Sequence, residues 1–456
     1  MEKPSRGAAW DMTEGPPAAM ILRFTVPMMI GNIFQQFYNL VDSIVVGRFV
    51  GSSELGGIGS AGSIHYLIFS LGYGISMGIG ILISILYGAK EKERLTQAIY
   101  NGFYAVAGVS VLISLVGGLG AGTVLRWMQT PEEVFPYALT YLRVTMLGSA
   151  ATMFYSAVSS VMRAFGDSRT PLYILIFASV VNVGLDLLLV VVFHLGVFGV
   201  AFATVVAQAL SAALGFLFAF RRLPQFRWQK GALRPDKALL KKCVRLGFPI
   251  AGQNILIALS CIVLQVVVNG FGELVVTANI AVTRIEQLVQ QPYGSLSSAL
   301  SAYTGQNIGA GRTDRVRQGF RVGLLAMAGF SCVMVAVIQL FGREILSVFV
   351  ADGEIVEIGA RALRITSWFY LFLGLLYVVR GILNGAGDAA YSALNGIVEV
   401  CCRVGLAAPL TKIPRVGMWG CFLCSGLTWM ITGLLSLVRY LTGRWKKTGG
   451  AVLAER

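Results

Sequence analysis

The stretch MILRFTVPMMIGNIFQQFYNLVDSIVV, residues 20–46, decides the fold class of this chain. It is largely apolar over more than the roughly 20 residues that an α-helix needs to cross a bilayer. Similar runs recur along the chain, and they lack the period-two alternation of a membrane-spanning strand. The sequence therefore predicts an all-α integral membrane protein.

Composition supports this prediction along the whole chain. Of 456 residues, 56% are hydrophobic and 13% are charged, and the mean hydropathy is +0.72, whereas soluble domains carry about a quarter charged residues. We predict twelve transmembrane helices, at residues 20–46, 54–86, 96–118, 136–161, 171–193, 196–219, 246–270, 274–306, 320–341, 356–380, 389–411 and 416–438.

The net charge of +15 is distributed unevenly over the predicted loops. The positive-inside rule places both termini and the basic 220–245 loop in the cytoplasm. We therefore attribute the excess positive charge to the orientation of the protein in the lipid bilayer, and we expect no nucleic-acid partner. The few basic residues on the opposite side are Arg48, Arg126, Arg343, Lys412 and Arg415.

An internal duplication organises the chain. A shift of about 221 residues aligns Gly166-Asp167 with Gly387-Asp388, and Pro27 with Pro249. Because each half holds an even number of helices, both halves enter the membrane from the same side, as parallel repeats. We therefore predict two six-helix lobes around a central cleft, residues 1–220 and 246–456 with a basic tail, joined by a basic cytoplasmic linker at 221–245.

One face of the first predicted helix is polar. Its polar residues recur at three- and four-residue steps and so share one side of a helix. We expect that side to line a wet cavity. The stripe comprises Asn32, Gln35, Gln36, Asn39 and Asp42.

Asn182 and Asp186 lie four residues apart in the fifth predicted helix and share a face. Asp42 and Asp186 both lie about 10 Å below the outer ends of their helices, so we expect them to meet in the first lobe. Because an ionisable group in the membrane is costly, it needs a partner or a task. A buried carboxylate holds either a proton or Na⁺, so we predict a coupling site for one of these ions; the alternative is local capping or hydrogen bonding.

The eighth predicted helix carries a second group of polar residues near mid-membrane. Several interpretations remain open for Arg284 and Glu286: a structural ion pair, contact with substrate, or a second protonation site. Amides extend the polar face at Gln287, Gln290 and Gln291.

Other chemistry has little support in the sequence. His65 and His194 belong to no cluster with metal-ligand spacing. The chain holds no GxxxxGK[ST] loop and no recognisable arrangement of nucleophile, base and orienting group. We therefore predict a protein that is not an enzyme, has no cofactor and binds no metal beyond Na⁺ at Asp42, Asn182 and Asp186.

Several stretches together resemble the multidrug-and-toxin-extrusion (MATE) family, especially its bacterial DinF-like and MepA-like branch. These are DMTEGPPAAMILRFTVPMMIGNIFQQFYNLVDSIVVGRFVG from residue 11, RAFGDSRTP, NVGLD, LGVFGVAFAT and TGQNIGAGRTDRVRQG. The resemblance runs over about residues 11–440 and implies a cation or proton site at Asp42, Asn182 and Asp186. It also implies a multi-pass protein of the bacterial inner membrane.

The chain departs from the family pattern in its second half. Where sodium-coupled members have a glutamate on the seventh helix, this sequence has Ile257, and the tenth predicted helix lacks an aspartate. Glu286 is then the obvious acidic substitute in that region. We therefore expect coupling through the first lobe.

The resemblance implies a secondary antiporter that exports small organic compounds against proton or sodium influx by alternating access. We expect cationic, aromatic substrates, held by charge and cation–π contact, and a monomer. Alternatives are a flippase for lipid-linked oligosaccharide or another lipid, and a scaffold or channel that has lost coupling. Candidate cleft residues are Asn32, Gln36, Tyr38, Asn39, Tyr155, Arg284, Glu286, Gln287 and Gln291.

Overall fold

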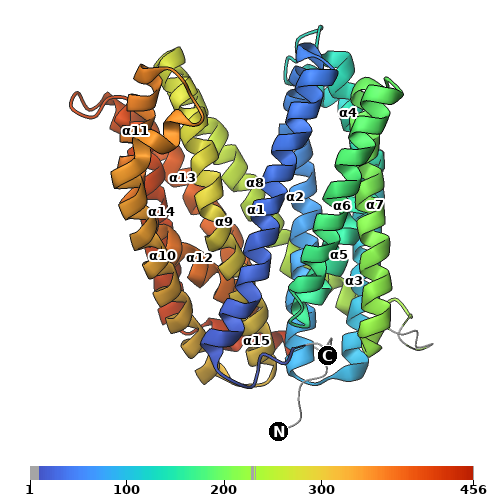
Figure 1. Ribbon diagram of the computed structural model, residues 1–456. Helices are drawn as coiled ribbons and strands as arrows, with labels where there is room; N and C mark the ends of the chain where they lie inside the picture. The colour runs from blue at the N-terminus through green and yellow to red at the C-terminus, as the bar shows by residue number, and fades with distance from the viewer. Residues whose placement is uncertain (1–9, 227–230, 232, 455–456) are drawn as a thin grey trace. The chain divides into compact units, whose positions relative to one another are not determined.

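The computed structural model describes residues 10–226, 231 and 233–454, without the side chains of 38–40, 42, 43, 52 and 451–454. The described residues form helices and no strands, which confirms the all-α prediction (Figure 1). The helices are α1 (Pro17–Phe49), α2 (Ser52–Gly88), α3 (Lys92–Trp127), α4 (Phe135–Leu147), α5 (Ser149–Ala164), α6 (Arg169–Leu187), η1 (Leu188–Val192), α7 (Gly196–Arg222), η2 (Pro224–Phe226), α8 (Lys237–Asn269), α9 (Glu273–Gly309), α10 (Thr313–Ser347), α11 (Gly353–Ser367), α12 (Tyr370–Gly385), α13 (Ala389–Lys412), α14 (Trp419–Leu441) and α15 (Trp445–Ala454).

The predicted number of membrane spans is confirmed. Within the described part of the chain, nine helices are long and apolar enough to cross a membrane, and two bent helix pairs raise the number to eleven. The 37-residue α9 is the twelfth; its polar residues keep its hydropathy below that of the others. Some helices are longer than predicted: α3 ends at Trp127, and α8 begins at Lys237, inside the predicted linker. Hydropathy identifies only the apolar part of a helix, so it does not predict the helical turns that extend beyond the membrane into water.

Two predicted spans are each broken into two helices. The span at 136–161 is the pair α4 and α5, bent by 50°, and the span at 356–380 is the pair α11 and α12, bent by 54°. The first bend falls at Gly148, where an added Cβ would overlap the side chain of Val205. Close helix packing thus requires glycine at this bend.

The chain divides into two compact units. The first unit comprises residues 10–12 and 26–251, and the second comprises residues 13–25 and 252–454. The unit boundaries fall inside α1 and α8, close to Pro27 and Pro249. The lobe limits at 220 and 246 stay a prediction.

Two equivalent positions of the repeats belong to a buried cluster in each unit. In the first unit, Val46 of α1, Val190 of η1 and Val200 of α7 form a buried cluster. In the second unit, Val268 of α8, Val275 of α9 and Cys421 of α14 form another. Val46 and Val268, and likewise Val200 and Cys421, correspond under the internal repeat. The duplication seen in the sequence therefore extends to part of the core packing, while the third members, Val190 and Val275, lie at positions that do not correspond.

Within the first unit, α2 and the first part of α8 cross at glycines. A Cβ added to Gly247 would lie 2.6 Å from Cα of Ile75 and 2.7 Å from the carbonyl oxygen of Gly74. A Cβ on Gly74 would lie 2.5 Å from the backbone nitrogen of Ala251. The two backbones approach too closely for any side chain at these positions.

We predict that Gly247→Ala lowers the free energy of unfolding by about 1–3 kcal/mol, because backbone atoms must move to admit the methyl group. Thermal unfolding in detergent measures the loss. Gly252→Ala in the same helix is the matched control, since a Cβ there meets nothing within 4 Å. Equal midpoints for the two variants would contradict the close crossing.

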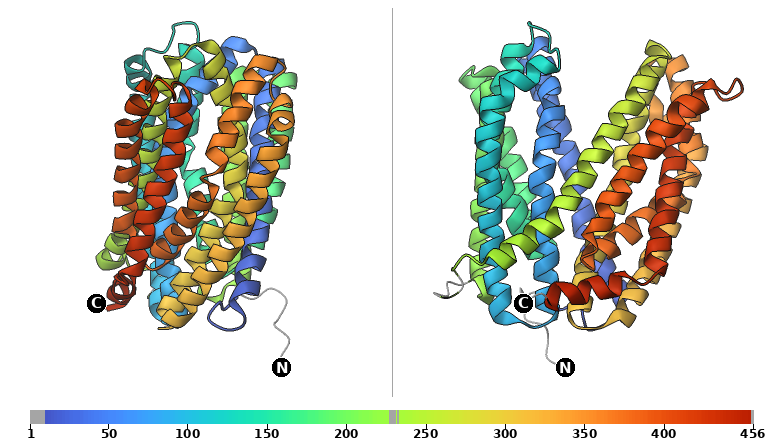
Figure 2. Two further views of the ribbon diagram at one scale, coloured as in Figure 1. Left: turned by 90° about the vertical axis from the view of Figure 1, so that its left-hand side faces the viewer. Right: turned by 180° about the vertical axis from the view of Figure 1, so that it is seen from behind.

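The C-terminal helix α15 packs on the second unit. The indole Nε1 of Trp445 donates a hydrogen bond of 2.9 Å to the carbonyl oxygen of Tyr440. The Trp445 and Tyr440 rings stack with centroids 5.5 Å apart, and Figure 2 shows α15 lying across the end of α14. The region predicted as a basic tail is thus an ordered helix up to Ala454.

Candidate functional site

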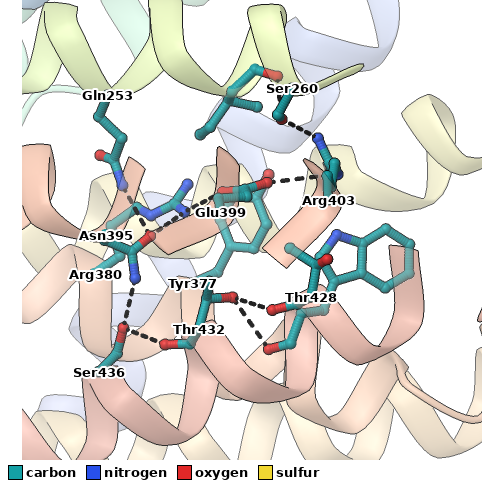
Figure 3. A network of polar contacts seen from close by, with 12 residues as sticks. Gln253, Ser260, Tyr377, Arg380, Asn395, Glu399, Arg403, Thr428, Thr432 and Ser436 are labelled. Carbon is teal, nitrogen blue, oxygen red and sulfur yellow. Dashed lines mark hydrogen bonds and ion pairs between the residues drawn. The ribbon is translucent and has the colours of Figure 1, made fainter. Parts of the chain in front are cut away.

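A cluster of three charged side chains lies inside the second unit (Figure 3). Nη2 of Arg403 lies 3.2 Å from Oε1 of Glu399, both on α13. Nη2 of Arg380, on α12, lies 3.8 Å from Oε2 of the same carboxylate. The side chains of Glu399, Arg403 and Arg380 are only 4%, 7% and 15% exposed. We call these residues the charge cluster.

Hydrogen bonds hold Arg403 against α8. Its Nη1 donates to Oγ of Ser260 at 2.6 Å and lies 2.9 Å from Sγ of Cys261. Glu399 and Arg403 are four residues apart, so they face each other on one side of α13. The guanidinium of Arg403 therefore contacts both Glu399 and the hydroxyl of Ser260 on α8.

Asn395, also on α13, connects the cluster to two further helices, α8 and α14. Its Oδ1 accepts hydrogen bonds from Nη2 of Arg380 at 3.1 Å and from Nε2 of Gln253 at 3.2 Å. Its Nδ2 donates to Oγ of Ser436 at 3.0 Å. Figure 3 shows these side chains converging from α8, α12, α13 and α14.

The polar atoms of the cluster are not all satisfied. Buried atoms without a hydrogen-bond partner include Nε of Arg380, Nε of Arg403 and Oε2 of Glu399. Buried charges normally form complete hydrogen-bond sets, because each unmade bond inside a membrane protein is costly. This incomplete set marks the cluster as a candidate site rather than a purely structural ion pair.

The charge cluster is not among the residues predicted from the sequence, where Glu286 is the obvious acidic residue of the region. Glu399 lies within the predicted span 389–411 and is buried. Its spacing of four from Arg403 is a signal that the sequence does contain. The participation of Arg380 carries no such signal, because it depends on how α12 packs against α13.

In the first unit, Asn182 and Asp186 are 1% and 0% exposed on α6. Asp186 lies near the end of α6, just before the π-helical turn Leu188–Val192. Both residues make polar contacts, and both lie inside the helical bundle of this unit. A buried carboxylate and amide one turn apart offer oxygen atoms that suit a small cation or a proton.

Packing places the Asp42 turn of α1 beside the Asp186 turn of α6. A Cβ added to Gly31 of α1 would lie 3.2 Å from the side chain of Leu172 on α6, and Val46 shares a core cluster with Val190. Val46 and Val190 each follow the corresponding aspartate by four residues, about one helical turn. The side chain of Asp42 itself is outside the described part of the chain, as are those of Tyr38 and Asn39.

The other predicted cleft residues are less enclosed. Asn32 and Gln36 are half-buried on α1, and Tyr155 on α5 donates a 3.3 Å hydrogen bond to the carbonyl oxygen of Pro171. On α9, Arg284 and Gln287 are exposed, whereas Glu286 and Gln291 are half-buried. One oxygen of Glu286, Oε1, is buried without a hydrogen-bond partner.

Arg284 and Glu286 form no ion pair with each other among the described residues. Residues two apart on a helix do not face each other. The structure therefore does not support the ion pair between Arg284 and Glu286 that the sequence left open. In the same unit, a buried ion pair joins Arg403 to Glu399 instead.

The fold and its buried charges define a multi-pass membrane protein built from two repeats of six spans. The MatE family model matches the chain twice, at residues 27–188 and 249–408. These two segments start at the residues that the internal repeat aligns. The chain belongs to the MatE family of membrane transporters, which confirms the predicted family and class.

Named relatives match nearly the full length. The "Probable multidrug resistance protein YoeA" of Bacillus subtilis (strain 168) is 30% identical over 93% of both chains. The "Probable multidrug resistance protein NorM" of Thermotoga maritima is 22% identical, over 94% of this chain and 93% of the relative. The "Multidrug export protein MepA" of Staphylococcus saprophyticus is 20% identical, over 83% and 84%.

Solved structures share the fold. An outward-facing multidrug resistance MATE family transporter of the MOP superfamily superposes with a TM-score of 0.89 at 22% identity, covering 98% of this chain and 100% of that one. A MOP superfamily transporter from Pyrococcus furiosus, whose binding pocket is described as having reverse polarity, gives 0.88 at 21% identity over 99% of both chains. The twelve-helix, two-lobe architecture is thus confirmed.

Proposed function

We propose that the protein exports small organic compounds from a bacterial cell, driven by inward movement of protons or Na⁺. The observation that carries this proposal is the 30% identity to a probable multidrug resistance protein over 93% of both chains. Full-length similarity supports a shared activity better than any single motif. The relatives' names favour small-compound export over lipid flipping.

Coupling is assigned to the first unit, at Asp42, Asn182 and Asp186. A carboxylate at 0% exposure inside the bundle is stable only when it is protonated or paired with a cation. A proton and Na⁺ cannot occupy the carboxylate at the same time. Either ion neutralises the site, and a conformational change then moves the bound ion across the membrane. The parallel packing of α1 and α6 supports a shared role for the aspartates on these two helices.

The proposal includes a position in the membrane. Basic residues such as Arg221, Arg222 and Lys237 border the segment between α7 and α8, which the positive-inside rule assigns to the cytoplasm together with both termini. Substrates are expected to be cationic and aromatic, since a carboxylate-bearing cleft attracts cations. We expect the monomer to be active, because each molecule carries both repeats.

Transport by purified protein in lipid vesicles tests the proposal. A fluorescent organic cation is expected to accumulate against its own gradient when a proton or a sodium gradient is imposed, and the effective gradient identifies the coupling ion. Collapse of the proton gradient with a protonophore, or of the sodium gradient with a sodium ionophore, should abolish the accumulation. Movement that only equalises concentrations under both gradients would contradict coupled export.

A further inference from the structure

The charge cluster of the second unit has an unbalanced charge. Arg380 and Arg403 contribute two positive charges and Glu399 one negative charge, and arginine keeps its proton in proteins. One positive charge therefore stays uncompensated among side chains that are at most 15% exposed. Such a charge in a low-dielectric interior requires a counter-charge.

Arg380 is the less neutralised of the two arginines. Glu399 lies closer to Arg403, at 3.2 Å, than to Arg380, at 3.8 Å. Within the described part of the chain, the guanidinium of Arg380 donates its hydrogen bond to the neutral amide of Asn395, and its Nε is buried without an acceptor. The free donor of a guanidinium is suited to an anionic oxygen or a halide.

Among the described residues, Arg380 has no second carboxylate within ion-pair distance. The Tyr377 ring lies 5.4 Å from the guanidinium carbon and stabilises a cation, but it does not cancel the charge. Glu286 is the other acid of this region, close enough to Arg403 for their charges to interact. It forms no ion pair within 4 Å with any described cation.

We propose that the second unit binds one small monovalent anion at the charge cluster, against Arg380. The ligand is chloride or the carboxylate group of a substrate, since both present one negative charge of suitable size. Binding makes the cluster neutral overall and supplies an acceptor for Nε of Arg380. This site is separate from the coupling site of the first unit; as a chloride site it does not rest on the proposed export activity, and as a site for a substrate carboxylate it does.

Thermal unfolding of the purified protein tests the site without any transport. Chloride is exchanged for gluconate at constant ionic strength, because gluconate is too large for a buried site. Chloride is expected to raise the unfolding midpoint by roughly 3 °C or more, in a saturable manner, since a ligand that binds only the folded state stabilises it by mass action.

Two variants neutralise the cluster in opposite ways. Arg380→Gln removes the uncompensated positive charge, and Asn395→Asp adds a negative charge to the side chain that already lies 3.1 Å from Arg380. Both are expected to lose the chloride response. If one variant does not fold, the other still tests the charge argument. Arg343→Gln, at a position 65% exposed, is the control and should keep the response.

Glu286→Gln tests whether Glu286, rather than a bound anion, supplies the counter-charge of the cluster. If wild type shows no chloride response, the proposal is overturned; a response that then appears in Glu286→Gln would assign the counter-charge to Glu286. A response that persists in both Arg380→Gln and Asn395→Asp would also overturn it, because the anion would bind elsewhere.

A matched pair of compounds distinguishes the two sources of the anion. Export of a carboxylate-bearing fluorescent compound is compared with export of its methyl ester, in wild type and in Arg380→Gln. Loss of acid export alone in the variant assigns the site to a substrate carboxylate. Equal behaviour of acid and ester, with the chloride response present in wild type, assigns it to chloride.

Discussion

Replacing Asp186 by asparagine is expected to abolish uphill export while leaving the fold intact. Asp186 is fully buried, and asparagine keeps its size and polarity but cannot exchange a proton or balance Na⁺. For a one-to-one exchange, a tenfold ion gradient supports up to about tenfold accumulation of a monovalent cation. The Asp186→Asn ratio should fall to about one in vesicles, and Asp42→Asn should behave in the same way.

Asp167→Asn is the matched control in the same unit. Asp167 accepts hydrogen bonds from the backbone nitrogens of Arg169 and Thr170 at the start of α6, and asparagine caps helices nearly as well as aspartate. Its accumulation ratio should therefore match that of wild type. Continued accumulation by folded Asp186→Asn would show that coupling depends on other residues.

The residues around Asp186 show which features a sequence can reveal. Asn182 and Asp186 interrupt an apolar run at helical spacing, and that signal is local. A similar depth in the membrane makes it possible for the Asp42 and Asp186 turns to meet, and the Val46–Val190–Val200 cluster supports their proximity. Patterns that lie within one helix, or that repeat between the two halves, are visible in the amino-acid sequence by itself.

Features that depend on contacts between helices are not visible in this way. The bend at Gly148 carries no proline, and it coincides with the close approach of Val205 from α7. In the sequence, Arg380 looks like a charged residue at the end of a membrane span. Its partners, Glu399 and Asn395, lie on α13, so the sequence does not show that they contact Arg380. The charge cluster therefore emerges only from packing, although the pair Glu399 and Arg403 has a recognisable i, i+4 spacing.

The second large effect is expected at Glu399. Glu399→Gln leaves Arg380 and Arg403 facing a neutral amide, so the cluster carries two uncompensated positive charges. Breaking a buried ion pair by removing one partner costs about 3–5 kcal/mol, because the remaining charge stays buried and unpaired. We expect a lower yield of monodisperse protein and a lower unfolding midpoint in detergent.

Glu357→Gln provides the control, since its contact with Arg343 is 3.9 Å long and the two side chains are 63% and 65% exposed. An exposed ion pair of this kind contributes at most about 1 kcal/mol to the free energy of unfolding, so Glu357→Gln should change the unfolding midpoint very little. A Glu399→Gln protein as stable as Glu357→Gln would mean that the cluster is hydrated and its charges are screened.

The double variant Glu399→Gln/Arg403→Gln decides whether charge or shape causes the loss. It restores the net charge of the wild-type cluster while removing both partners of the 3.2 Å ion pair. If charge dominates, the double variant recovers much of the stability that Glu399→Gln loses, as expected when both members of a buried pair are replaced together. If it is no more stable than the single variant, the carboxylate acts mainly by joining α13 to α12, and the hydrogen bonds of Asn395 would be the next contacts to remove.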